Sequence, residues 1–259
     1  MLRNLVASFR LLVVTVVLCC GVYPLALWAV GQTLLPSQAN GSLVYDKDGK
    51  AVGSRQIAQE FKNAAYFQPR PSAASYKAEA SGASNWSASN YALRDRVAQT
   101  LGPIVKYKSG PKAGQLVAPD VVAWVRENKD TVDAWVKAHP TIASGLAKTK
   151  EPVDAAAVFF DLWRQEHPQV ELAPVPADLV MSSGSGLDPH ITLDGALYQL
   201  DRVAGKWAEL HKRDEAGVRS EIETLVRGHA SAPLAGLAGV PLVNVLEVNL
   251  ALREKYGAP

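Results

Sequence analysis

The chain has 259 residues, and its composition excludes two kinds of protein. It carries 27 Lys and Arg against 25 Asp and Glu, a formal net charge of +2 at pH 7. This near balance, without a block of basic residues, argues against nucleic acid as a partner. The 2 cysteines, Cys19 and Cys20, share one apolar stretch, so the chain is not a scaffold organised by disulfide bonds.

Near the amino terminus lies a long segment without charge. Residues 11–45 contain no Asp, Glu, Lys, Arg or His, and residues 11–30 are almost entirely apolar. At about 1.5 Å per residue, a helix over this run crosses a hydrocarbon layer of about 30 Å. A cleaved signal peptide is the alternative, although its apolar run is normally shorter. We predict a transmembrane anchor at 11–31, after a cytoplasmic tip at 1–10 and before a linker at 32–42 and a soluble domain at 43–259.

The charges beside the apolar segment predict its orientation. Arg3 and Arg10 lie just before it, whereas the first charges after it begin at Asp46. Lys and Arg close to a span favour the cytoplasmic side of a membrane. We therefore expect the amino terminus inside the cell and the soluble domain outside the cytoplasm.

The stretch after the linker mixes a hairpin with loops. Apolar residues flank Asp48-Gly49 within residues 42–54, and this pair suits the positive φ of a tight turn between two strands. Residues 56–61 suggest a short helix. Residues 69–90 are rich in Ser, Ala, Gly and Asn, which predicts a loop.

Residues 101–174 show a repeated tryptophan pattern. Ala-Trp-Val occurs at 123–125 and again at 134–136, and both Trp135 and Trp163 precede a His-Pro pair by four residues. This spacing predicts short helices, two of them ended by His-Pro, because proline disfavours the helical state in the residue before it. We expect the tryptophans to pack in a core, His139 and His167 to stack on the rings, and Asp130 and Pro152 to lie near helix starts.

The carboxyl-terminal part predicts a loop followed by helices. Residues 194–204 and 217–228 have helical spacing, and Asn244 followed by Glu247 is a capping sequence for a last helix. Few strands and many helices occur without regular alternation. The predicted fold class is therefore α+β, with one transmembrane helix before a mixed α/β soluble domain.

The densest polar cluster is the glycine loop, residues 182–190. Its glycines could expose backbone N–H groups to an anion, but the Lys-Ser/Thr pair of a P-loop is missing. Ser185, Asp188 and His190 also suggest a hydrolase, although they lie closer in sequence than triad members normally do. A structural turn or contact loop is the alternative interpretation.

Two further polar features accompany the glycine loop. Residues 81–85 form a small polar segment that could contact an anion or a partner's backbone, or be an ordinary solvated loop. Arg70 lies between two prolines, where its guanidinium suits bidentate capture of a carboxylate, with an internal salt bridge as the alternative. The five histidines lack metal-ligand spacing, so no metal site and no catalytic residue is predicted.

Together these motifs resemble the KdpC family, the small subunit of the bacterial high-affinity potassium-transporting P-type ATPase. The stretches that carry the resemblance are Tyr23-Pro24 in the span, Arg70-Pro71-Ser72-Ala73, residues 81–85, the glycine loop with Ile191, and the sequence Val-Asn-Val-Leu-Glu-Val-Asn-Leu-Ala-Leu at 243–252. Relative to the shorter common form of the family, residues 103–168 look like a helical Trp-rich insertion.

The resemblance implies a non-catalytic accessory subunit in the bacterial inner membrane, with its soluble domain in the periplasm. Its partners would be a channel-like pore subunit and the P-type ATPase catalytic subunit. The family is described as a catalytic chaperone that raises the ATP affinity of the ATPase subunit, so ATP is reached through the complex and no cofactor is bound tightly. The residues expected to contact nucleotide or partner are Gln59, Arg70, Ser81, Gly82, Ser84, Asn85, Ser183, Gly184, Ser185, Gly186, Asp188 and His190.

Two other functions stay open at the level of sequence. One is a membrane-tethered serine hydrolase that uses Ser185 and His190. The other is an extracytoplasmic binding module that docks another partner through its Trp helices. Neither would require an ATPase to accompany the protein.

Overall fold

The computed structural model describes residues 2–46, 48–139, 154–232, 236–237 and 239–259. The predicted helix start at Pro152, the proline after His139 and residues 140–153 of the predicted insertion lie outside these ranges. The chain divides into two compact units, Met1–Ile57 and Ala58–Pro259, and each is described by itself.

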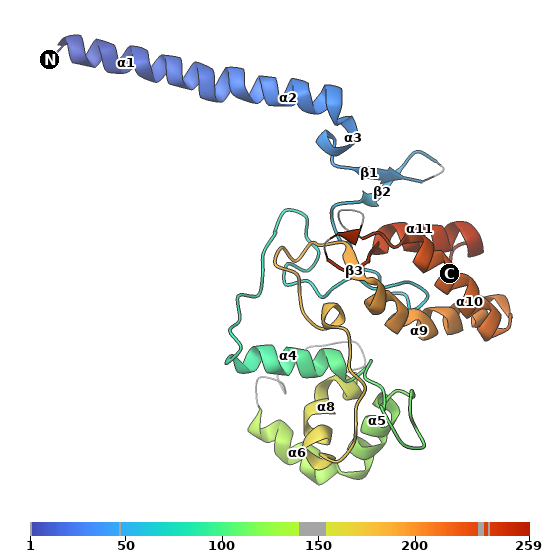
Figure 1. Ribbon diagram of the computed structural model, residues 1–259. Coiled ribbons are helices and arrows are strands. Elements are labelled where there is room, and N and C mark those ends of the chain that lie inside the picture. Colours follow the sequence, from blue (N-terminus) through green and yellow to red (C-terminus); the bar gives the residue numbers. More distant parts are fainter. Residues whose placement is uncertain (1, 47, 140–153, 233–235, 238) are drawn as a thin grey trace. The chain divides into compact units, whose positions relative to one another are not determined.

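The first unit contains a long apolar helix (Figure 1). It is built from α1 (Leu2–Val16), the π-helical stretch η1 (Val17–Val22) and α2 (Tyr23–Leu34), 33 residues in all. At about 1.5 Å per residue it is about 50 Å long. It extends further than the expected span at both ends, so the basic tip forms its first turns. By length and composition it is the one helix among the described residues that could cross a membrane.

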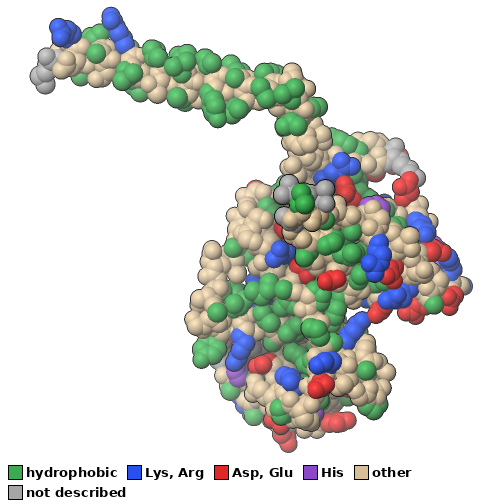
Figure 2. All heavy atoms as spheres, viewed as in Figure 1, with side chains coloured by type: hydrophobic (Ala, Val, Ile, Leu, Met, Phe, Trp, Pro, Cys, Tyr) green, Lys and Arg blue, Asp and Glu red, His purple; other side chains and the backbone are tan. Residues whose placement is uncertain are grey.

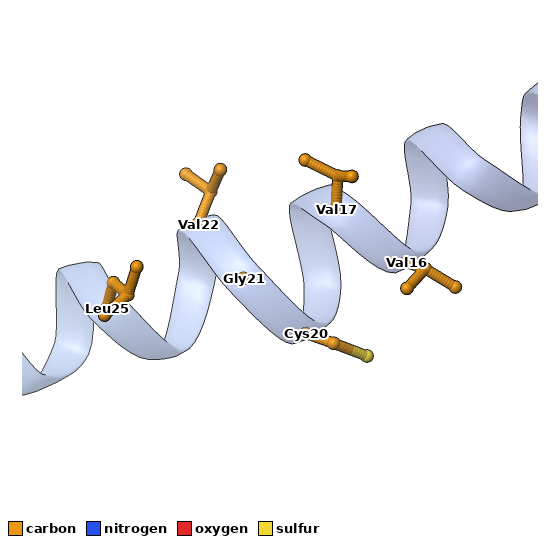
Figure 3. Close-up of a pocket in the computed structure, with 6 residues that line it drawn as sticks. All are labelled: Val16, Val17, Cys20, Gly21, Val22 and Leu25. Atoms are coloured by element: carbon orange, nitrogen blue, oxygen red, sulfur yellow. The ribbon is translucent and has the colours of Figure 1, made fainter.

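The π-helical stretch has a local cause. The Tyr23 N–H donates to the carbonyl of Leu18, five residues back, and the next residue is Pro24, whose ring would clash with the carbonyl four residues earlier in a regular helix. Figure 2 shows hydrophobic side chains along the helix and basic ones at its amino-terminal end. Figure 3 shows the residues that line an open pocket at this turn: Val16, Val17, Cys20, Gly21, Val22 and Leu25.

A helical turn and a hairpin complete the first unit. After α3 (Pro36–Ala39), strands β1 (Leu43–Tyr45) and β2 (Ala51–Ser54) pair antiparallel. The Asp46 carboxylate accepts hydrogen bonds from the backbone N–H groups of Asp48 and Lys50, and Gly49 adopts a φ of 74°. The predicted hairpin is confirmed.

The second unit begins with an irregular segment. Residues 58–90 contain neither helix nor strand, which confirms the loop predicted at 69–90. The short helix predicted at 56–61 is wrong. The Ala58 N–H donates to the Leu187 carbonyl, at 2.8 Å, so the chain here binds a distant loop and does not form a helical turn.

One group of helices surrounds the tryptophans. It consists of α4 (Tyr91–Leu101), α5 (Ala118–Glu127), α6 (Lys129–Ala138) and α8 (Ala155–Glu166). Trp163 is buried in their common core, against which Trp124 and Trp135 pack. His139 stacks on Trp135 and His167 on Trp163, with ring centroids 4.3 and 4.7 Å apart. The predicted packing role and both stacks are confirmed, while the status of residues 103–168 as an insertion stays a prediction.

The other group combines helices with a small sheet. Its elements are η2 (Ala177–Leu179), β3 (His190–Thr192), α9 (Leu193–His211), α10 (Glu215–His229), β4 (Leu242–Asn244) and α11 (Val245–Tyr256). Strands β3 and β4 pair antiparallel, with His190 opposite Asn244. Trp207 is fully buried, and its indole N–H donates to the Ala65 carbonyl. Burying on the order of 200 Å² of such a side chain contributes roughly 5 kcal/mol. The structure is thus mixed helix and sheet.

Polar side chains cap the amino-terminal ends of the helices in this group. The Thr192 hydroxyl caps α9 and the Asp214 carboxylate caps α10. Asn244 caps α11 by accepting from the N–H groups of Leu246 and Glu247, because a side-chain oxygen there satisfies N–H groups that have no partner within the helix. The predicted start of the last helix is confirmed.

Candidate functional site

The two polar loops predicted as contact sites lie against one another. The Gly82 N–H donates to the Ser185 carbonyl at 2.8 Å, and the Ser81 hydroxyl donates to the same oxygen at 3.2 Å. The sequence suggested each loop separately. The structure joins them into a single candidate site.

The next two carbonyls of the glycine loop also accept hydrogen bonds from the irregular segment. The Gly186 carbonyl accepts from the Ser72 hydroxyl, and the Leu187 carbonyl accepts from the Ala58 N–H. Three successive carbonyls therefore bind the irregular segment 58–90. We call this arrangement the loop junction.

Three backbone N–H groups of the glycine loop are used within the loop. Those of Leu187 and Asp188 point to the hydroxyls of Ser185 and Ser183, and that of Gly186 donates to the Ser183 carbonyl. An anion-binding nest needs N–H groups that are free to point at the anion. These three N–H groups are therefore not available to an anion.

A line of polar side chains leads from the loop to α11. The Asp188 carboxylate accepts from the His190 N–H at 3.0 Å and lies 3.2 Å from His190 Nδ1, while His190 Nε2 lies 3.5 Å from the side-chain amide of Asn244. The hydrogen bond from the His190 ring holds the pKa of Asp188 below its usual value, against a smaller opposing effect of burial. Asn244 is also the cap of α11, so one side chain both contacts the loop's His190 and begins this helix.

The geometry does not support the hydrolase hypothesis. The Ser185 hydroxyl accepts from the Leu187 N–H, and the two ring nitrogens of His190 face Asp188 and Asn244. Among the described residues no hydrogen bond joins Ser185 to His190. Activation of a serine nucleophile requires that contact with its base.

Arg70 takes part in an internal ion pair. Its guanidinium lies 3.7 Å from the Asp188 carboxylate and 3.5 Å from the Ser182 carbonyl, so the internal salt bridge considered from the sequence is formed. Three of the predicted contact residues make no hydrogen bond to the glycine loop within the described part of the chain. They are Gln59, Ser84 and Asn85.

Sequence reasoning missed several contributors to this site, among them Ser72 and Arg96. Ser72 donates to the glycine loop, and its place beside Arg70 in Pro-Arg-Pro-Ser was the available signal. Arg96 lies with one guanidinium nitrogen 3.5 Å from the Ser182 hydroxyl. No local pattern marks Arg96, because α4 is placed beside the loop only by tertiary packing.

The described fold and site define a class of protein. It has one apolar helix able to cross a membrane and a mixed helix and sheet unit in which two polar loops are joined by hydrogen bonds. No group of three or more His, Cys, Asp and Glu among the described residues is placed to hold a metal ion. This architecture is typical of a membrane-anchored subunit.

Comparison with known proteins identifies the family. The KdpC family, described as the c chain of the K⁺-transporting ATPase, matches residues 5–125 and 126–254. The chain therefore belongs to the KdpC family.

Individual relatives agree over nearly the whole chain. A protein of Parvibaculum lavamentivorans named potassium-transporting ATPase KdpC subunit is 36% identical, over 97% of this chain and 96% of the relative. Proteins of the same name from Rhodopseudomonas palustris and Bacillus cytotoxicus are 34% and 30% identical, over 97% and 95% of this chain and 97% and 93% of the relatives.

Proposed function

We propose that this chain is the accessory subunit of a potassium-importing ATPase complex, which it stabilises through its anchor and its loop junction. The observation that carries the proposal is the family match, which covers residues 5–125 and 126–254. As a member of this family the chain is an accessory subunit, and the catalytic chain is separate. Its partners in the proposal are the pore subunit and the P-type ATPase catalytic subunit.

Growth at limiting potassium tests the subunit role. A strain that keeps the pore and catalytic subunits but lacks this chain should grow poorly at micromolar potassium, and the full chain should restore growth. A strain that grows equally well with and without the chain would contradict the proposal.

The proposed orientation places the second unit outside the cytoplasm. It is supported by Arg3 and Arg10 at the start of the helix and by the absence of charge from residue 11 to residue 45. A phosphatase that is active only outside the cytoplasm, fused to the carboxyl terminus, should be active. An inactive phosphatase fusion, together with a fluorescent cytoplasmic reporter at the same position, would reverse the orientation.

We further propose that any effect on ATP affinity passes through the other subunits. ATP is cytoplasmic, whereas the proposed orientation puts the loops on the other side of the membrane. The internal use of three glycine-loop N–H groups, those of Gly186, Leu187 and Asp188, supports a protein contact instead of a nucleotide contact. The KM for ATP of the purified complex should rise severalfold when this chain is removed, while the chain alone should not bind ATP in a calorimetric titration. An unchanged KM would exclude the chaperone role.

A further inference from the structure

Two arginines from separate parts of the second unit meet at the start of the glycine loop. Arg70 comes from the proline-flanked segment, and its Nη2 lies 3.5 Å from the Ser182 carbonyl. Arg96 comes from α4, and its Nη1 lies 3.5 Å from the Ser182 hydroxyl. The two guanidinium groups therefore both contact Ser182.

These arginines carry buried nitrogens without a hydrogen-bond partner. They are Nε of Arg70 and both Nε and Nη2 of Arg96. Buried polar groups are normally hydrogen-bonded, and an unpaired donor costs about 1–3 kcal/mol. The contacts to Ser182 are at the long end of the hydrogen-bond range. The three buried N–H donors of the two arginines therefore lack a hydrogen-bond acceptor.

Among the described residues, the one carboxylate paired with either arginine is a weak acceptor. Asp188 lies 3.7 Å from Arg70, which is beyond ordinary hydrogen-bond length. Its other oxygen is held by His190. Asp188 therefore reduces the local charge but does not satisfy the buried N–H groups.

An exposed aromatic side chain covers Arg96. The Trp86 ring centroid lies 5.0 Å from Arg96 Cζ. A ring face stabilises a guanidinium charge but accepts no hydrogen bond from N–H groups in the guanidinium plane. Trp86 is 40% exposed and lies in a segment without helix or strand.

Apolar side chains adjoin Arg70. Met181, next to Ser182, is 38% exposed. An open hollow of about 520 Å³ lies beside Arg70, where Met181 and Pro176 line it together with the carboxylates of Asp178 and Asp194. Aromatic, methionine and arginine side chains are enriched at the centres of protein interfaces. This composition suits a protein surface better than a small soluble anion.

We propose that Arg70 and Arg96 receive a carboxylate side chain from a neighbouring subunit, with Trp86 and Met181 packing around it. The chemical reason is that a carboxylate offers two oxygens with several lone pairs and matches the planar donor edge of a guanidinium. We call this arrangement the two-arginine site. It rests on the proposed function, because that function supplies the neighbouring subunit.

Zero-length cross-linking of the detergent-purified complex tests the two-arginine site. Arg96→Lys places an amine at the site, and a carbodiimide joins an amine to a carboxylate only when the two are in contact. We expect an amide between position 96 and an Asp or Glu of another subunit, located by mass spectrometry. The matched control is Arg94→Lys, because Arg94 lies on the same helix but pairs with Asp95 and Asp161 of its own chain. The control should give at least tenfold fewer links between subunits. An assembled complex in which position 96 links only within its own chain would overturn the proposal.

Retention of the subunit gives a second readout. Arg96→Gln and Arg70→Gln should each lower the amount of this chain that stays with the complex in gel filtration by fivefold or more, while Arg94→Gln should leave it within twofold. Thermal unfolding of each variant separates lost contact from lost fold, and Arg96→Lys carries the test if Arg96→Gln does not fold. A wild-type chain found without an ATPase defeats the proposed function itself. A wild-type chain retained no better than Arg96→Gln defeats only the two-arginine site.

Discussion

Gly186 lies where the glycine loop packs closely against the irregular segment. Its φ is 67°, and a Cβ built there would lie 2.7 Å from the Gly82 carbonyl oxygen and 3.1 Å from the Ala74 nitrogen. Both contacts are with backbone, which cannot move aside as the end of a flexible side chain can. The close approach and the left-handed conformation together require glycine.

Gly186→Ala should therefore destabilise the chain by about 2 kcal/mol or more, since left-handed strain alone costs of order 1–3 kcal/mol. The measurement is chemical unfolding of the full-length protein in detergent. Gly184→Ala is the matched control, because nothing lies within 4 Å of its Cβ. The control should stay within about 0.5 kcal/mol. Equal effects of the two changes would show that the loops do not meet as described.

Because of Asp188, the free energy of unfolding should depend on pH in the acid range. Its folded-state pKa is lowered chiefly by the hydrogen bond from His190. The charged form is thus favoured by folding, and its contribution is present above the unfolded-state pKa and lost as pH falls through the lowered folded value. The difference in unfolding free energy between wild type and Asp188→Asn should shrink as pH falls below about pH 4. A difference that is the same at pH 3 and pH 7 would contradict this assignment.

At the scale of elements, α11 is connected to the irregular segment by one buried amide. Asn249 is 1% exposed. Its side-chain oxygen accepts from the Phe67 N–H and its amide donates to the Phe67 carbonyl, both at 2.9 Å. A backbone that passes through a core without a strand partner needs such a substitute. Asn249 thus fixes the segment that leads to Arg70 and the loop junction.

Asn249→Leu keeps the number of side-chain heavy atoms but leaves both Phe67 groups unpaired. At about 1–3 kcal/mol for each buried unpaired group, the expected loss of unfolding free energy is about 2–6 kcal/mol. Glu254→Gln, on an exposed position of the same helix, should change it by no more than about 0.5 kcal/mol. Urea unfolding of the full chain compares the two, and a neutral Asn249→Leu would refute the structural role.

Elements with strong local signals were predictable from the sequence. The apolar helix followed from a charge-free run, the hairpin from Asp48-Gly49, and the start of α11 from Asn244. The predicted helix at 56–61 failed because its hydrogen bond goes to Leu187, far along the chain. Local patterns contain no information about such a partner.

At the scale of the whole molecule, the same limit applies to the candidate site. Composition marked residues 81–85 and the glycine loop separately, but the hydrogen bonds that join them connect residues more than 100 positions apart. Arg96 gave no signal at all, because its role depends on where α4 packs. The family resemblance supplied the function that local physics left open, and the comparisons confirmed the family.

Co-purification tests the central claim, that this chain is an accessory subunit of a potassium-transporting ATPase, most directly. The full-length chain, tagged at its carboxyl terminus and extracted in mild detergent from its own cells grown at limiting potassium, should elute with a P-type ATPase catalytic chain and a pore chain in a fixed ratio. The same preparation should hydrolyse ATP in response to potassium. A chain that elutes without any P-type ATPase, while its unfolding shows it to be folded, would contradict the account.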